Sequence, residues 1–157
     1  MKITILTIGK TEDNYLRDGM EKYIKRLKHY IKLNVIEIPD IKNTKSLSVE
    51  QQKAKEAELI TKKITNTDHV ILLDERGQEL SSVQFSGLFN KKMVASIQHL
   101  VFVIGGPYGF DPSLQNRADE KLSLSKMTFS HQMVRLFFLE QVYRAFTIIN
   151  GEPYHHD

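Results

Sequence analysis

The sequence is organised around the stretch Leu100-Val101-Phe102-Val103-Ile104-Gly105-Gly106-Pro107-Tyr108-Gly109. Its apolar first half is typical of a strand that is buried on both faces, as in a parallel sheet. The glycines that follow allow a sharp backbone turn and let a ligand approach the peptide groups. Their spacing matches neither the G-x-G-x-x-G dinucleotide fingerprint nor the G-x-x-x-x-G-K-[ST] phosphate loop. The stretch therefore predicts a buried strand that ends in a turn, which either binds another kind of ligand or is purely structural.

Strands and helices alternate on both sides of this stretch. The predicted strands are Lys2–Ile8, Leu33–Ile38, His69–Leu73, Leu100–Ile104 and Lys121–Ser125. The predicted helices are Asn14–Tyr30, Val49–Ile64, Ser82–Ser96, Pro112–Ala118 and Met133–Ile149, with a loop over 40–48 and an extended tail over Gly151–Asp157. This order is typical of an α/β fold with a mostly parallel sheet and helices on both faces. Because no linker or repeat interrupts it, we expect residues 1–157 to form a single domain.

The composition excludes several classes of protein. Among 157 residues, 41% are hydrophobic and 26% are charged, as in an ordinary globular domain. The absence of cysteine excludes disulfide scaffolds, thiol catalysis and cysteine-ligated metal centres. No stretch approaches the roughly 20 apolar residues of a membrane span, and the N-terminus lacks the pattern of a signal peptide. We therefore expect a cytoplasmic protein that uses neither a membrane nor a metal.

The charge is divided unevenly along the chain. Residues 1–65 contain 14 Lys or Arg against 9 Asp or Glu, a balance of +5. Residues 66–157 contain 8 against 10, a balance of −2, which gives the chain its net charge of +3. The basic half indicates either a solvated lysine-rich surface or a face that binds a polyanion.

The ends of the predicted strands are the expected ligand site, because ligands of open α/β sheets bind beyond the carboxyl ends of the strands. Those ends fall at Gly9, Leu73–Gly77, Gly105–Gly109 and Ser125–Phe129. Around the last of these, short hydroxyl residues alternate with apolar ones. Such a segment can offer backbone hydrogen-bonding groups from an apolar wall.

The predicted helix Met133–Ile149 carries apolar residues on nearly all of its faces. Such a helix is buried on most sides. The sheet covers one side, so we expect a second subunit to cover the other, although a central helix within a monomer is the alternative. Arg135 and Arg144 are polar exceptions that need carbonyl or anionic partners if buried. Pairing of Arg144 with Glu140, four residues earlier, would make Arg144 structural.

Four motifs occur in order along the chain. They are Phe102-Val103-Ile104-Gly105-Gly106-Pro107-x-Gly109, Leu122-Ser123-Leu124-Ser125-Lys126-Met127-Thr128-Phe129-x-His131, Gln141-Val142-Tyr143-Arg144-Ala145-Phe146 and Pro153-Tyr154-His155. In combination they resemble the ribosomal large-subunit methyltransferase H family of the SPOUT class, and the resemblance covers nearly the whole chain. One departure is Ser130, where many members have proline before the histidine.

The resemblance implies a fold, a cofactor and a substrate. The fold is an α/β trefoil knot whose C-terminal part holds S-adenosylmethionine. The implied cofactor-binding residues are Leu73, Gly105, Leu124, Ser125, Lys126, Met127, Thr128 and Phe129. Family members are homodimers that methylate N3 of a pseudouridine in 23S ribosomal RNA, so 23S RNA within the ribosome and a second copy of the chain are the implied partners.

The implied reaction assigns tasks to polar residues. Methyl transfer to a ring nitrogen requires in-line positioning, removal of the imide proton and stabilisation of the resulting anion. His131 and His155 are the candidate proton acceptors, because histidine titrates near neutral pH. Arg135, Arg144 and Tyr154 are candidates for holding the base or nearby phosphates, and Tyr154 can also stack on RNA.

Several alternatives remain open at this point. The substrate is either free RNA or the assembled ribosome, and the proton acceptor is not fixed by the motifs. A SPOUT enzyme that acts on transfer RNA and a non-catalytic ribosome-binding factor are the two rival functions.

Overall fold

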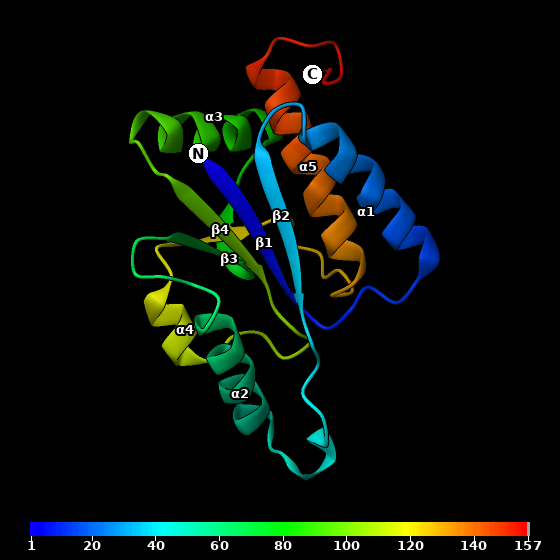
Figure 1. Cartoon of the computed structure of the whole chain (residues 1–157), viewed down its shortest axis with the longest axis vertical. Helices are drawn as coiled ribbons and strands as arrows, with labels where there is room; N and C mark the ends of the chain where they lie inside the picture. The colour runs from blue at the N-terminus through cyan, green and yellow to red at the C-terminus, as the bar shows by residue number, and fades with distance from the viewer. Residues whose placement is uncertain (157) are drawn as a thin grey trace.

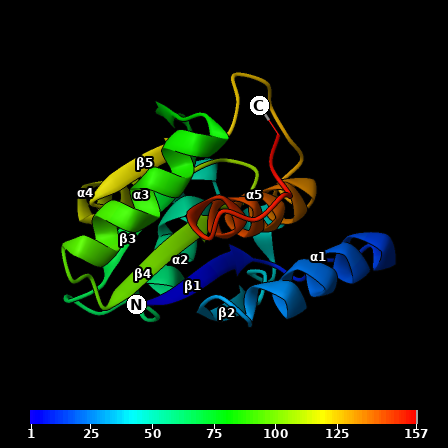
Figure 2. The same ribbon diagram turned by 90° about the horizontal axis from the view of Figure 1, so that it is seen from above.

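Five strands form one sheet in the order β2-β1-β4-β3-β5 (Figure 1 and Figure 2). In this computed structural model, which describes residues 1–156, the strands are β1 (Lys2–Ile8), β2 (Lys32–Ile38), β3 (His69–Glu79), β4 (His99–Ile104) and β5 (Glu120–Ser123). Neighbouring strands pair in parallel, and Lys2 lies opposite both Lys32 and His99. The carboxyl ends of the strands therefore lie along one edge of the sheet.

Helices cover both faces of the sheet (Figure 2). One face carries α1 (Asn14–Leu27), α3 (Ser82–Val94) and α5 (Met133–Ile149), and the other carries α2 (Val49–Thr61) and α4 (Pro112–Arg117). Alternate residues of β1 point into the two cores, because side chains of a strand alternate between faces. Ile3 and Ile5 belong to the first core, and Leu6 and Ile8 belong to the second. The predicted α/β fold with helices on both faces is confirmed.

α5 is the central helix of its layer and lies between α1 and α3 over the sheet (Figure 2). Phe138, Val142 and Ala145 have no exposed surface. Phe137 is the exception, because 46% of its surface is exposed. The helix is therefore covered on most sides within one chain, and Phe137 is its exposed large apolar side chain.

The structure corrects the predicted tail, which is folded back rather than extended. Gly151 adopts a left-handed conformation with φ of +67° after the last turn of α5. Its N–H donates to the carbonyl oxygen of Ile148 at 3.0 Å, and the N–H of Glu152 donates to that of Thr147 at 2.9 Å. These two bonds form a Schellman motif, which reverses the chain at the end of a helix. Residues 152–156 consequently lie beside the end of α5.

The other predicted bounds agree with the structure within three residues, except at two places. The loop over 40–48 contains a short 3-10 turn, Thr44–Ser46. β3 does not end at Leu73 but continues to Glu79, because it resumes pairing with β5 after an irregularity. The helix starts are as expected: Ser81 caps α3 by accepting from the N–H of Gln84, and Asp111 caps α4.

Candidate active site

A cavity of about 630 Å³ opens at the carboxyl edge of the sheet. It lies beyond the ends of β4 and β5 and beside residues 73–76 of β3, and the loop between β5 and α5 forms one wall. Seven of the predicted cofactor-binding residues line it: Leu73, Gly105, Leu124, Ser125, Met127, Thr128 and Phe129. Lys126 is exposed and is not part of the lining. Segments that are far apart in the sequence therefore meet at one cavity, as expected for the ends of parallel strands.

Hydroxyl groups hold the loop between β5 and α5 in shape. Ser123 Oγ donates to the carbonyl oxygen of Ser125 at 2.9 Å, and Ser125 Oγ accepts from the N–H of Met127 at 2.9 Å. Ser130 Oγ accepts from the N–H of Met133 at 3.0 Å. Serine at position 130, where the resembled family often has proline, thus ties the loop to the start of α5.

Gly105 lies where a side chain would not fit. A Cβ atom at this position would lie 2.9 Å from Cε1 of Phe110, which is itself buried beneath the turn. The turn after β4 therefore exposes its backbone to the cavity while Phe110 supports it from below. This close approach explains the glycine that the sequence places at the end of the buried strand.

The cavity fits a nucleoside with a polar extension. Its volume is within the range of pockets that hold a small molecule. Ile104, Leu122, Leu124 and Phe129 give it apolar walls for an aromatic base, and the turn at Gly105 offers peptide groups. Charged side chains of β3, at residues 74–76, form another part of the lining. S-adenosylmethionine combines these two kinds of group, so the residues present fit the predicted cofactor.

His131 lines the same cavity, whereas Arg135 is buried beside it. Arg135 is 1% exposed and donates to the carbonyl oxygens of Ile8 at 2.5 Å and Gly9 at 2.9 Å, and to Thr11 Oγ1 at 2.9 Å. Its Nε also donates to the carbonyl oxygen of His131 at 3.1 Å. The guanidinium therefore fastens the first turn of α5 to the end of β1 and has no surface for RNA.

The other predicted substrate-side residues cluster at the far end of α5. Glu140 accepts hydrogen bonds from Arg144 Nη2 at 2.5 Å and from the Tyr154 hydroxyl at 3.1 Å. The Arg144 guanidinium lies 4.8 Å from the centre of the Tyr154 ring, and its Nη1 is 3.3 Å from His155 Nδ1. Arg144 thus pairs with Glu140 as anticipated, and it also contacts Tyr154 and His155 of the tail.

Tyr154 keeps its proton at neutral pH. Burial raises the pKa of the Tyr154 hydroxyl, and hydrogen bonding with Tyr23 and the nearby Glu140 carboxylate act in the same direction. The phenol is therefore a hydrogen-bond donor or a stacking surface rather than a proton acceptor. His131 and His155 remain the candidates for that task.

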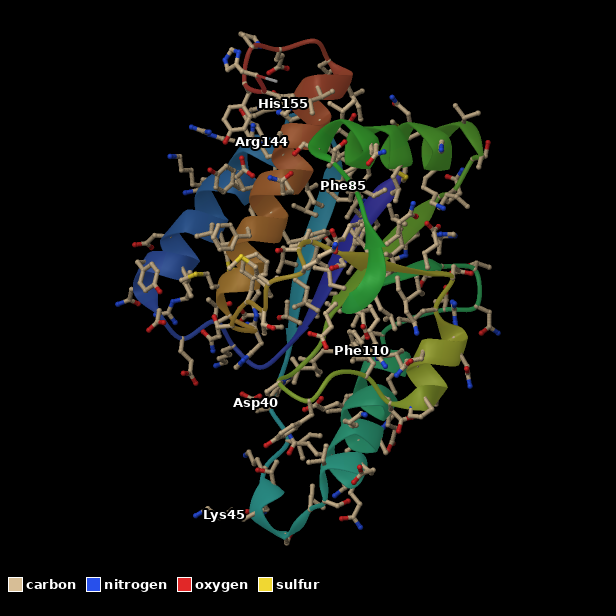
Figure 3. The ribbon with its side chains drawn as sticks, turned by 180° about the vertical axis from the view of Figure 1, so that it is seen from behind. Asp40, Lys45, Phe85, Phe110, Arg144 and His155 are labelled. Atoms are coloured by element: carbon tan, nitrogen blue, oxygen red, sulfur yellow. The ribbon has the colours of Figure 1, made fainter. Side chains whose placement is uncertain are left out.

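The cluster of Arg144, Tyr154 and His155 does not lie at the cavity of its own chain (Figure 3). α5 has 17 residues, and a helix rises about 1.5 Å per residue, so its two ends are separated by roughly 25 Å. His131 precedes one end and the tail follows the other. The resemblance implies that both groups serve one reaction, whereas a single chain places them at opposite ends of α5.

Sequence reasoning missed two charged groups beside the cavity. Lys53 on α2 contributes to the lining, and Glu56, one turn later, lies behind the glycine turn. Burial raises the pKa of the Glu56 carboxyl, while a hydrogen bond from Gln52 opposes the rise. No motif marked either residue, because α2 reads as a polar surface helix.

Two features are absent from the described residues, 1–156. No helix in this range is long and apolar enough to cross a membrane. The same range contains no group of three or more His, Asp or Glu side chains placed to hold a metal ion.

Comparisons with known proteins show which family the chain resembles. The family model described as "Predicted SPOUT methyltransferase" matches residues 1–155. A protein of Parabacteroides distasonis is 55% identical over 157 residues, which is 100% of both chains, and is named ribosomal RNA large subunit methyltransferase H. A protein of Flavobacterium johnsoniae with the same name is 56% identical over 156 residues, covering 99% of both chains.

A solved structure supports the fold independently. A probable methylase family protein from Haemophilus influenzae matches 99% of this chain and 70% of its own, with a TM-score of 0.54 and 15% identity. At that identity the likeness concerns the fold alone. The full-length match to the family model, together with relatives above half identity, leads to one conclusion: the chain belongs to the SPOUT methyltransferase family.

Proposed function

We propose that this protein transfers a methyl group from S-adenosylmethionine to N3 of a pseudouridine in 23S ribosomal RNA. The observation that carries the proposal is the convergence of Leu73, Gly105 and the loop 124–129 on one cavity of fitting size. The name shared by relatives that are 52–56% identical over their full length supports ribosomal RNA as the substrate class.

The methyl donor supplies an activated methyl group on a sulfonium. The protein's own residues must then orient the base, take up the imide proton of N3 and stabilise the negative charge that develops. His131 lies in the cavity lining and is the first candidate for the proton. Arg144 offers a cation for the base or its phosphates, and Tyr154, whose hydroxyl donates to Glu140, offers its ring for stacking.

We propose that the working unit is a homodimer, in which the tail of one protomer completes the cavity of the other. Two features support this arrangement. The substrate-side cluster lies at the C-terminal end of α5, whereas the cavity of the same chain lies beside the N-terminal end. Phe137 is 46% exposed, and its ring lies 5.2 Å from that of Phe129, which lines the cavity. A second copy that covers Phe137 would therefore dock beside the cavity.

RNA is expected to approach the end of the molecule that carries the tail. Lys22 and Lys25 are exposed on α1, and Tyr23, between them, lies 3.5 Å from Tyr154, hydroxyl to hydroxyl. The basic N-terminal half thus contributes cations next to the substrate-side cluster. In a dimer these cations would flank both cavities and attract the phosphate backbone.

The test is methyl transfer from labelled S-adenosylmethionine to ribosomes, protein-free 23S RNA and transfer RNA that lack the modification. Mass spectrometry of the nucleosides should show N3-methylpseudouridine in 23S RNA, and the better of the two ribosomal substrates identifies the natural one. Methylation of transfer RNA alone would replace the proposed substrate. Failure to bind S-adenosylmethionine would favour a non-catalytic ribosome-binding factor in the cytoplasm.

A mixing experiment tests the composite site. Gly105→Val damages the cavity, and Tyr154→Ala with His155→Ala damages the tail, so each homodimer should be inactive. After the two proteins are mixed and allowed to exchange, about a quarter of wild-type activity should return, because half of the dimers are mixed and each carries one intact site. Persistent inactivity, with subunit exchange verified, would place the whole site within one chain.

A further inference from the structure

β3 carries an insertion at the mouth of the cavity. Leu73 pairs with Leu122 of β5, and Gln78 pairs with the same Leu122, so residues 74–77 are looped out between two paired stretches. Insertions of this kind re-aim side chains and are common beside active sites. Asp74, Glu75 and Arg76, which form the insertion with Gly77, line the cavity.

Gly77 allows the insertion to close against the sheet. A Cβ atom at this position would lie 2.6 Å from backbone atoms of Lys121 and Leu122. Only glycine permits the backbone of β3 to pass this close to β5. The close packing of Gly77 against β5 therefore fixes the position of the three charged residues that precede it.

An ion pair fixes the direction of the Arg76 side chain. Its Nε donates to Asp74 Oδ1 and its Nη2 to Asp74 Oδ2, both at 3.0 Å, and its backbone N–H donates to Oδ1 at 2.9 Å. The Asp74 side chain is 5% exposed, whereas that of Arg76 is 63% exposed. In such a two-pronged pair the remaining N–H groups of the guanidinium point away from the carboxylate. The free N–H groups of Arg76 are thus held in a fixed orientation beside the cavity.

The charges of the insertion indicate the kind of ligand. Asp74, Glu75 and Arg76 sum to a net charge of −1, so a phosphodiester would be attracted by the guanidinium but repelled by two carboxylates. A zwitterion suits this segment better, because its carboxylate can meet Arg76 while its ammonium group meets a neighbouring carboxylate. The amino-acid end of S-adenosylmethionine is such a zwitterion, and the adjacent sulfonium adds a positive charge.

We propose that Arg76, oriented by Asp74, binds the carboxylate of the amino-acid end of the methyl donor and so sets specificity for the complete cofactor. The inference rests on the proposed function, since it assumes that the cavity takes S-adenosylmethionine. It adds a recognition device to the apolar wall at Leu124 and Phe129, which suits the base of the same molecule.

The test compares two ligands that differ at the amino-acid end. S-adenosylmethionine carries the zwitterion, and 5′-methylthioadenosine lacks it. Affinities are measured by calorimetry on the wild-type chain and on Arg76→Gln, Arg76→Lys and Asp74→Asn. Arg17→Gln is the matched control, because Arg17 is an exposed arginine on α1 that also bonds a neighbour in its own segment, Asn14.

Arg76→Gln should lower the affinity for S-adenosylmethionine about 10- to 100-fold, which is the effect of losing a hydrogen bond to a charged group. Affinity for 5′-methylthioadenosine should stay within about twofold, which would show that the cavity itself is intact. Arg76→Lys should retain part of the affinity, because lysine keeps the positive charge but lacks the paired N–H donors of a guanidinium. Asp74→Asn should fall between the wild type and Arg76→Gln, and the control should match the wild type.

Three outcomes would overturn the inference. Equal weakening of both ligands would mean that the substitution has collapsed the cavity rather than removed one hydrogen-bonding group. Unchanged affinity for S-adenosylmethionine with weaker, less salt-dependent RNA binding would assign Arg76 to a phosphate instead. A wild-type chain that binds neither ligand would overturn the proposed function as well, whereas binding without methylation of 23S RNA would overturn the proposed function alone.

Discussion

Arg135 Nη1 donates a hydrogen bond to the carbonyl oxygen of Gly9 at 2.9 Å, across 126 positions of sequence. Gly9 follows β1 with φ of +77°, and a Cβ there would lie 2.6 Å from Asp40 Oδ1. The bond therefore joins a backbone that requires glycine to the first turn of α5. Because Arg135 also holds the carbonyl of His131, it positions the end of the cavity loop relative to the sheet.

Replacement of Arg135 by methionine should destabilise the protein without a direct effect on RNA. The carbonyl oxygens of Ile8 and Gly9 would be left unsatisfied in a buried place, at a cost of about 2–4 kcal/mol in the free energy of unfolding. Urea denaturation measures the cost. If Arg135→Met were as stable as the wild type but bound RNA weakly, Arg135 would bind the substrate rather than act as a positioning residue.

Substitutions at Gly105 should impair cofactor binding in proportion to their size. Alanine would approach Cε1 of Phe110 at 2.9 Å and require a small shift, whereas valine would displace the ring. Calorimetry should show weaker binding of S-adenosylmethionine by Gly105→Ala and none by Gly105→Val. Gly87→Ala is a suitable control, because nothing lies within 4 Å of a Cβ at that position. Unchanged affinity in Gly105→Val would remove this turn from the binding site.

Reversal of charge on α1 should weaken RNA binding and leave cofactor binding intact. The double variant Lys22→Glu with Lys25→Glu avoids Arg26, whose guanidinium lies 5.3 Å from the centre of the Tyr143 ring and also packs there. The slope of log affinity against log salt should fall by about 0.7–0.9 for each phosphate that the variant no longer neutralises. An unchanged slope would mean that these lysines are only a solvated surface.

Stability below pH 4 should depend on Asp68, whose side chain is 5% exposed. Burial opposes ionisation, but hydrogen bonds from Thr65 and from His99 outweigh it and lower the pKa of Asp68. A lowered pKa in the folded state stabilises the protein above the unfolded value, about 3.9, and this contribution is lost as pH falls through the folded value. In acid titrations of unfolding, Asp68→Asn should lose stability less steeply than the wild type below pH 4. Identical slopes would contradict the assignment.

Local pattern was enough to predict the layers and the position of the cavity. Continuous apolar runs such as Leu100–Ile104 are typical of buried parallel strands, and the carboxyl ends of parallel strands in one sheet share one edge. Seven residues of the predicted cofactor set consequently meet at one cavity, although they come from three segments.

The sequence predicted the pair of Arg144 with Glu140 from its spacing, but not the partners of Arg135 or the contact of Arg144 with Tyr154. Arg135 and Arg144 are both isolated cations in an apolar helix, yet one donates to the carbonyls of β1 and the other pairs with Glu140 and Tyr154. Helical periodicity gives the face on which a residue lies, but not the element that packs there. The reversed tail and its distance from the cavity depend in the same way on packing outside α5.

The sequence by itself thus determined the alternation of strands and helices and the edge of the sheet at which the cavity opens, because both follow from the chain's local hydrophobic pattern. Only the tertiary structure decided what Asp74 and Arg76 do. Whether β3 stops at Leu73 or loops out and resumes depends on its pairing with β5, which lies more than 40 residues further along the chain. That pairing, rather than the local residues, turns a charged turn into a fixed ion pair at the mouth of the cavity.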